Sequence, residues 1–174
     1  MLKLGKRVMI IGPSNSGKST LTANLGKKTG YPVLHLDQIA HKPGTNWERT
    51  DIDWFVAEHD KFIEQENWII EGNYSVCMPQ RIARAETVIW CDPSLLGCMY
   101  RYILRSLKSP DNRIGTLKGA HRELNLSLIK YTLRNYPKNR KKYAAFLAEG
   151  SHLDIKHYKS FKQIKALSDM EVAV

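Results

Sequence analysis

The sequence predicts an α/β domain in which a parallel β-sheet is covered by helices on both faces. Short apolar runs at residues 7–11, 33–36, 68–71 and 87–91 alternate with segments of helical periodicity. Because each run is only four or five residues long and apolar on both faces, these runs are typical of buried parallel strands. A chain of 174 residues suits a single domain and is too short for two of ordinary size.

Glycines, prolines and capping residues mark the element ends in the first half of the chain. The strand at 7–11 is followed by a helix over 18–29, which Gly30 ends. Residues 50–53, with the sequence Thr-Asp-Ile-Asp, resemble a capping box. They predict the start of a further helix, which we expect to end near Asn67.

The second half of the chain is mainly helical. Apolar residues recur at helical spacing from Leu95, and residues 109–119 are polar and contain glycine, as in an exposed loop. A second helical stretch begins near His121, and Pro137 should kink or divide it. The chain then ends with an expected strand and an expected helix, at residues 153–158 and 160–167.

A phosphate-binding motif, G-x-x-x-x-G-K-[ST], lies between the first strand and the first helix, which is the context it requires. The residues assigned to this site are Gly12, Pro13, Ser14, Asn15, Ser16, Gly17, Lys18 and Ser19, with Thr20 following. The glycines allow backbone N–H groups to surround phosphate oxygens, and the helix dipole adds positive charge. Lys18 would bridge the β- and γ-phosphates, and the Ser19 hydroxyl would bind Mg²⁺. The motif therefore predicts binding of ATP with Mg²⁺.

Acidic residues stand at the ends of three expected strands, where ligands bind in open α/β sheets. Asp37 follows the second strand, Glu71 ends the third, and Asp92 follows the fourth. Each could hold Mg²⁺ through water or accept a proton from an acceptor hydroxyl. The alternative is that they cap helices or lie in loops. We expect Glu71 to join Ser19 at the metal, and Asp37 to act on the acceptor.

Arg101 and Arg105 are four residues apart on an expected helix, so they project from the same face. The planar guanidinium group suits a clamp on the transferring phosphoryl group. We expect both arginines to be catalytic and Arg101 also to contact ATP. The alternative is an ordinary solvated pair on a basic helix.

The net charge of +10 arises entirely in residues 93–174, which hold 16 of the 27 Lys and Arg but 6 of the 17 Asp and Glu. Such an excess favours an anionic partner, either a polyphosphate or a nucleic acid, although solvated basic faces are common. The most basic segment is 138–142, with Tyr131, Tyr136 and Tyr143 around it. Tyrosines in this pattern more often pack between helices than stack on bases.

Cysteine usage and hydropathy give expectations about the compartment. Cys77, Cys91 and Cys98 form neither a CxxC pair nor an even set. A reducing, cytoplasmic location fits them better than a disulfide framework or a zinc site. Because no stretch has the roughly 20 apolar residues of a membrane span, we expect a soluble protein without a membrane partner.

The order of these motifs resembles the adenylate-kinase-like P-loop kinases over nearly the whole chain. The strongest likeness is to the bacterial DNA topology modulation proteins, which share the phosphate-binding loop and a basic C-terminal half. The other shared segments are His35-Leu36-Asp37 and Trp68-Ile69-Ile70-Glu71-Gly72-Asn73-Tyr74.

The resemblance implies a three-layer αβα fold, with a five-stranded sheet in the order 2-3-1-4-5 and a short lid at about residues 106–120. It also implies an acceptor site that includes Asp37, Tyr74, Arg81 and Arg84. The segment D-G-[FY]-P-R of nucleoside monophosphate kinases is replaced here, so no arginine occupies its last position. Asp37 is instead similar to the carboxylate that handles the acceptor hydroxyl in shikimate- and gluconate-type kinases.

Three functions follow from these patterns. The first is a kinase that uses Mg-ATP to phosphorylate a nucleotide or a small hydroxyl-bearing acceptor. The second is an ATP-dependent regulator that binds nucleic acid weakly through its basic half, although no recognised DNA-binding motif is present. The third is a nucleotide-binding module without catalysis, which remains open because Glu71 replaces the more usual Asp.

Overall fold

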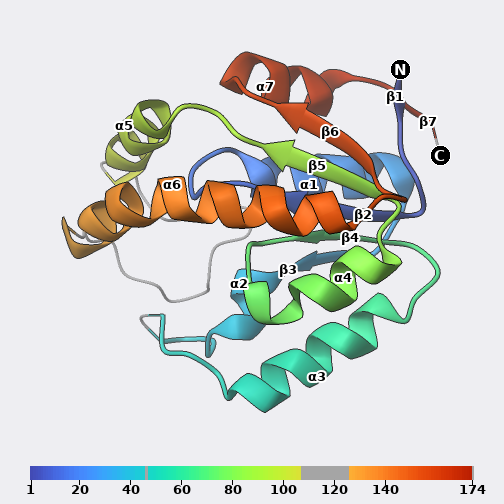
Figure 1. The fold of residues 1–174 in the computed structure, drawn as a ribbon, viewed down its shortest axis with the longest axis horizontal. Coiled ribbons are helices and arrows are strands. Elements are labelled where there is room, and N and C mark those ends of the chain that lie inside the picture. Colours follow the sequence, from blue (N-terminus) through green and yellow to red (C-terminus); the bar gives the residue numbers. More distant parts are fainter. Residues whose placement is uncertain (46, 107–125, 174) are drawn as a thin grey trace.

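A computed structural model describes residues 1–45, 47–106 and 126–173, and its centre is a five-stranded parallel sheet (Figure 1). The strand order is β3-β4-β2-β5-β6, which confirms the expected order 2-3-1-4-5. The strands are β2 (Arg7–Ile11), β3 (Val33–His35), β4 (Trp68–Glu71), β5 (Thr87–Cys91) and β6 (Asp154–Tyr158).

Side chains alternate between the two faces of the sheet, and each face has its own helix layer. Val8 and Ile10 of β2 pack toward α1 (Lys18–Thr29) and α7 (Phe161–Asp169). Met9 and Ile11 pack toward the opposite layer. That layer contains α2 (Leu36–Ala40), α3 (Ile52–Ile63), α4 (Met78–Arg84) and α6 (Leu126–Glu149). The three-layer αβα prediction is therefore confirmed.

Several boundaries differ from the sequence expectation. Leu36 begins α2 instead of ending the strand, so Asp37 lies in the first turn of a helix. The N-cap of α3 is Asp51, whose carboxylate accepts hydrogen bonds from the N–H groups of Asp53 and Trp54. This helix ends at Ile63 rather than near residue 67, and the indole N–H of Trp68 donates to the Ile63 carbonyl.

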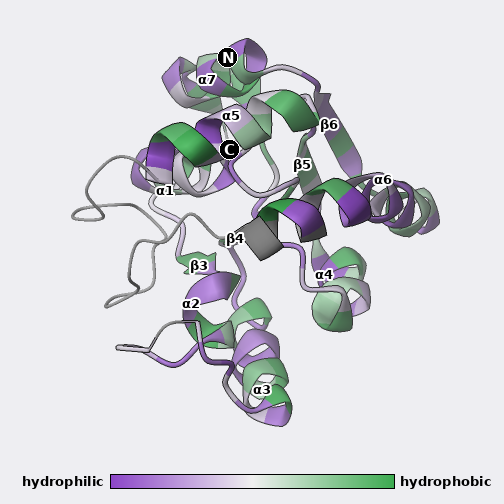
Figure 2. Ribbon diagram, turned by 90° about the vertical axis from the view of Figure 1, so that its left-hand side faces the viewer, coloured by the Kyte–Doolittle hydropathy of each residue, from purple (hydrophilic) through white to green (hydrophobic). Residues whose placement is uncertain are grey.

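The C-terminal half brings further differences. Helix α5 spans Leu95–Ser106, and α6 continues through Pro137 without being divided. Much of α6 is hydrophilic, with apolar residues between (Figure 2). The expected lid at 106–120 lies, except for Ser106, outside the described residues.

Near the two ends of the chain, two short strands that the sequence did not predict pair with each other. Strands β1 (Leu2–Lys3) and β7 (Val172–Ala173) form a separate two-stranded parallel sheet (Figure 1). The 3₁₀ helix η1 (Ser75–Cys77), also unpredicted, leads directly into α4.

In the described part of the chain, no helix is both long and apolar enough to cross a membrane.

Candidate active site

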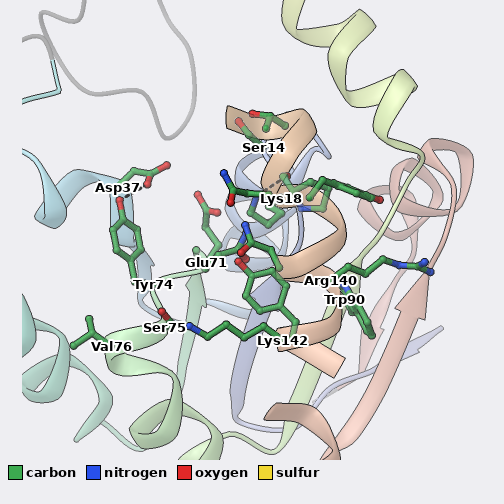
Figure 3. A pocket seen from close by; sticks show the side chains of 18 of the residues that line it. Ser14, Lys18, Asp37, Glu71, Tyr74, Ser75, Val76, Trp90, Arg140 and Lys142 are labelled. Carbon is green, nitrogen blue, oxygen red and sulfur yellow. Dashed lines mark hydrogen bonds between the residues drawn. The ribbon is translucent and has the colours of Figure 1, made fainter. Parts of the chain in front are cut away.

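A cavity of about 550 Å³ opens at the carboxyl ends of β4 and β5 (Figure 3). Such a volume is ordinary for a small-molecule site. One wall is the phosphate-binding loop, a second is α2 with the segment after β4, and a third is α6. The lining includes Pro13, Ser14, Lys18, Asp37, Arg49, Glu71, Asn73, Tyr74, Ser75, Trp90, Asp92, Tyr136, Arg140, Lys142 and Tyr143.

The phosphate-binding loop has a backbone that suits an anion. Gly17 is the N-cap of α1 with φ 101°, a left-handed conformation that favours glycine. No side chain from the described residues caps this helix, and its first turn contains no acidic residue. The Lys18 ammonium donates to the Pro13 carbonyl at 2.9 Å, which folds it across the loop. The free helix start and the nearby ammonium fit a bound phosphate chain.

The remaining loop residues support this shape. Gly12, with φ 145°, lies so close to β5 that a Cβ would come 1.9 Å from the Cys91 carbonyl oxygen. The Ser16 hydroxyl is buried and has no hydrogen-bond partner among the described residues. Asn15 donates to the Ser14 hydroxyl, whereas Thr20 is exposed on α1 and is not part of the cavity lining.

Ser19 and Glu71, the expected metal ligands, are in direct contact. Glu71 Oε1 accepts from the Ser19 hydroxyl at 2.8 Å and pairs with His35 Nδ1 at 3.0 Å. Although burial alone would raise it, the pKa of Glu71 is lowered by the His35 hydrogen bond, the charge of Lys18 and the Ser19 hydrogen bond. A hydroxyl beside an ionised carboxylate is a donor set that suits Mg²⁺, which keeps much of its water shell.

Asp37 faces the same cavity from α2. The Tyr74 hydroxyl donates to Asp37 Oδ1 at 2.7 Å (Figure 3). Burial, together with the charge and hydrogen bond of Asp37, raises the pKa of Tyr74, so the phenol stays protonated and remains a donor. Apart from this bond, no described residue donates to the Asp37 carboxylate. As far as the described residues go, its second oxygen is open to a ligand.

The segment Gly72–Tyr74 connects the two halves of the cavity. The Asn73 side chain accepts from the Gly12 N–H at 3.1 Å and donates to the Gly12 carbonyl at 2.5 Å. The adjacent Tyr74 holds Asp37. One short segment thus positions both Gly12, the first residue of the phosphate-binding loop, and the Asp37 carboxylate.

Arg81 supports this segment from its buried side and does not line the cavity. Its side chain is fully buried and donates to the carbonyls of Gly72 at 2.8 Å, Tyr74 at 2.9 Å and Cys77 at 3.4 Å. Burial lowers the pKa of Arg81 to about 10, which leaves the group charged at neutral pH. In this conformation the guanidinium group is committed to backbone carbonyls. The placement of Arg81 therefore does not match the acceptor contact expected from sequence.

Three other predicted arginines also lie away from the cavity lining. Arg84 donates to the Glu64 carbonyl at the end of α3. Arg101 stacks over the Phe161 ring at 4.7 Å, and Arg105 is exposed. The face of α5 that meets the phosphate-binding loop carries Cys98, Met99 and Tyr102 instead. The role of Arg101 and Arg105 as a phosphoryl clamp stays a prediction.

Helix α6 supplies residues that sequence analysis assigned to other roles. Asp92 is buried and contacts three side chains: the Tyr136 hydroxyl at 3.1 Å, Arg140 Nε at 2.8 Å and His157 Nε2 at 2.9 Å. The Trp90 indole stacks on His157, with ring centroids 4.2 Å apart. Asp92 therefore ties α6 to the sheet, as a structural carboxylate would. Tyr143 belongs to the core, as expected for a packing tyrosine.

Comparison with known proteins gives a match by structure only. No protein-family model and no curated protein matches the sequence. Shikimate kinase from Bacteroides thetaiotaomicron matches with TM-score 0.54 and 13% identity, over 97% of this chain and 94% of that chain. A gluconokinase from Sinorhizobium meliloti 1021 matches with TM-score 0.54 and 12% identity, over 95% and 90%. Deoxyadenosine kinase from M. mycoides, with the products dCMP and dCDP bound, matches with TM-score 0.50 and 15% identity, over 97% and 95%.

At such low identity these likenesses show the fold alone. The chain is an α/β protein with the architecture of small P-loop kinases. The comparisons support this broader resemblance and do not single out the DNA topology modulation proteins.

Proposed function

We propose that this protein is an ATP-dependent phosphotransferase, which transfers the γ-phosphoryl group of Mg-ATP to a nucleotide or a small hydroxyl-bearing acceptor. One observation carries the proposal: a single cavity is lined by Lys18 of the phosphate-binding loop and by Asp37, whose Oδ1 is held by Tyr74. Donor-side and acceptor-side groups would therefore face the same cavity. The likeness to three kinases of known structure supports the same class.

The donor side would hold ATP and Mg²⁺ through residues already in position. Lys18 can exchange its bond to the Pro13 carbonyl for phosphate oxygens, and the N–H groups at the start of α1 face the same region. Ser19 and Glu71 would hold Mg²⁺, directly or through water. When bound, Mg-ATP supplies the phosphoryl group, and the cation offsets phosphate charge.

The acceptor side would act through Asp37. Because Tyr74 donates to Oδ1, the carboxylate is fixed in orientation, and Oδ2 can accept the proton of an acceptor hydroxyl. Arg101 and Arg105 complete the proposed set if they approach the phosphates when ligands bind. The basic segment 138–142 gives little support to a nucleic-acid role, since Arg140 pairs with Asp92 and Lys142 lines the cavity.

The test is ADP formation from ATP with a panel of nucleoside monophosphates, nucleosides, sugars and hydroxy acids. An acceptor-dependent rate is expected for at least one class. Asp37→Asn should then lower kcat by roughly 10²-fold or more, because the charge that accepts the proton is lost. ATP affinity, measured by calorimetry, should stay within about twofold. ATP binding without turnover on any acceptor would instead indicate a nucleotide-binding module.

A further inference from the structure

The charged side chains that line the cavity are unequally neutralised. Within the part of the chain that the structure describes, seven such residues line it: Lys18, Asp37, Arg49, Glu71, Asp92, Arg140 and Lys142. Asp92 and Arg140 neutralise each other, and Glu71 is held by Ser19 and His35. Lys18 lies across the phosphate-binding loop. Arg49 and Lys142 remain as cations with no ion pair to any residue in 1–45, 47–106 or 126–173.

These two cations come from different elements and flank the acceptor-side carboxylate. Arg49 lies between α2 and α3, where its backbone bridges to His41. Its charge acts on the Tyr74 hydroxyl: burial and Asp37 raise the pKa of Tyr74, and Arg49 opposes them. Lys142 extends from α6 across the cavity toward Ser75, the residue after Tyr74 (Figure 3). Both cations are therefore at the Asp37–Tyr74 end.

The arginines expected from sequence to bind the acceptor are used elsewhere. Arg81 is fully buried under the Gly72–Tyr74 segment, and Arg84 donates to the end of α3. If the acceptor carries a negative charge, Arg49 and Lys142 are, among the described residues of the cavity, the cations left to bind it. Asp37 lies in the same lining and forms no ion pair with either cation, so the two cations can attract an anionic ligand whose hydroxyl faces Asp37.

We propose that the acceptor is an anionic hydroxyl compound, whose carboxylate or phosphate group is held by Arg49 and Lys142 while its hydroxyl faces Asp37. This inference rests on the proposed phosphotransferase function and names its substrate class. The forked guanidinium of Arg49 can make two parallel hydrogen bonds to a carboxylate or a phosphate. The single ammonium of Lys142 adds a point charge from the opposite wall.

The experiment uses related acceptors, neutral and anionic, that all keep a free hydroxyl: glycerol with glycerate and with glycerol 3-phosphate, and glucose with gluconate and with glucose 6-phosphate. ADP formation is followed with the complete chain and Mg-ATP. Turnover is expected only with anionic members, and the carboxylate and phosphate arms distinguish the two kinds of anion. Turnover confined to neutral members would overturn the anionic inference and retain the phosphotransferase. No turnover with any member would refute the phosphotransferase and the inference with it.

Two variants test the residues. Arg49→Met and Lys142→Met should each raise the KM of the anionic acceptor by roughly tenfold or more, with the KM of ATP unchanged. Lys141→Met is the matched control, because Lys141 is exposed on the same helix and does not line the cavity. It should leave both KM values unchanged. Equal acceptor KM values for the parent and Arg49→Met would show that another residue binds the acceptor's anionic group, and would refute the proposal.

Discussion

Replacing Arg81 by Met tests whether this arginine is a structural support or an acceptor ligand. The substitution leaves the carbonyls of Gly72 and Tyr74 without the donors that now lie at 2.8 and 2.9 Å. A buried carbonyl that loses its partner costs about 1–3 kcal/mol, so the two together cost about 2–6 kcal/mol. Removing a buried charge recovers part of this. We expect a net loss of about 3 kcal/mol, a large share of a typical stability of about 5–15 kcal/mol.

Urea unfolding at equilibrium measures this loss, and Arg84→Met is the control. Arg84 is three residues further along α4, is half-buried, and its side chain donates a hydrogen bond of 3.2 Å to the Glu64 carbonyl. Its replacement should cost about 1 kcal/mol or less. A stability change below about 1 kcal/mol for Arg81→Met, combined with a raised acceptor KM, would refute the structural role and return Arg81 to the acceptor site.

Three further predictions follow from the site and the core. Lys18→Ala should weaken ATP binding and abolish turnover without loss of fold. Calorimetry measures the ATP affinity, ADP formation measures turnover, and circular dichroism checks the fold; unchanged ATP affinity would disprove the phosphate-binding assignment. Asn73→Ala removes both hydrogen bonds to Gly12 and should weaken ATP binding by roughly tenfold. Equal ATP affinity of the variant and the parent would show that the loop keeps its shape without the Asn73 side chain. Burial lowers the pKa of His59, although its hydrogen bond to the Asp60 carboxylate opposes this shift. The unfolded chain therefore binds the proton more readily, and stability is lost as pH falls below 6.5. His59→Gln should reduce that slope by up to about 1.4 kcal/mol per pH unit, and parallel slopes in urea titrations would contradict the assignment.

The central strands and the phosphate-binding loop could be predicted because their signals are local. Strand β2 is apolar at every position from residue 8 to 11, and the glycines beside it have the spacing that a phosphate-binding backbone needs. The placement of Asp37 and Glu71 beside one cavity follows from the same reasoning, since parallel strands place their carboxyl ends at one edge, and their roles stay predictions.

What the sequence could not show depends on partners distant in the chain. Arg81 has the residue type of an anion ligand, and only the folded position of η1 reveals that backbone carbonyls surround it. Arg140 looked like part of a basic surface until the fold brought it to Asp92, 48 positions away. Periodicity reports which face of an element is apolar, and it carries no information on which distant group will face a given charge.

The buried cysteines make the chain suitable for covalent labelling. Cys77, Cys91 and Cys98 are free, and each is at most 1% exposed. Burial raises their thiol pKa values to about 11, 12 and 11, so almost no thiolate is present at neutral pH. A maleimide dye should therefore react with a cysteine introduced on the surface of α6 long before it reaches the native thiols. With a second cysteine introduced on the surface of α3, a pair of dyes would report the distance between α6 and α3 without first removing any native cysteine.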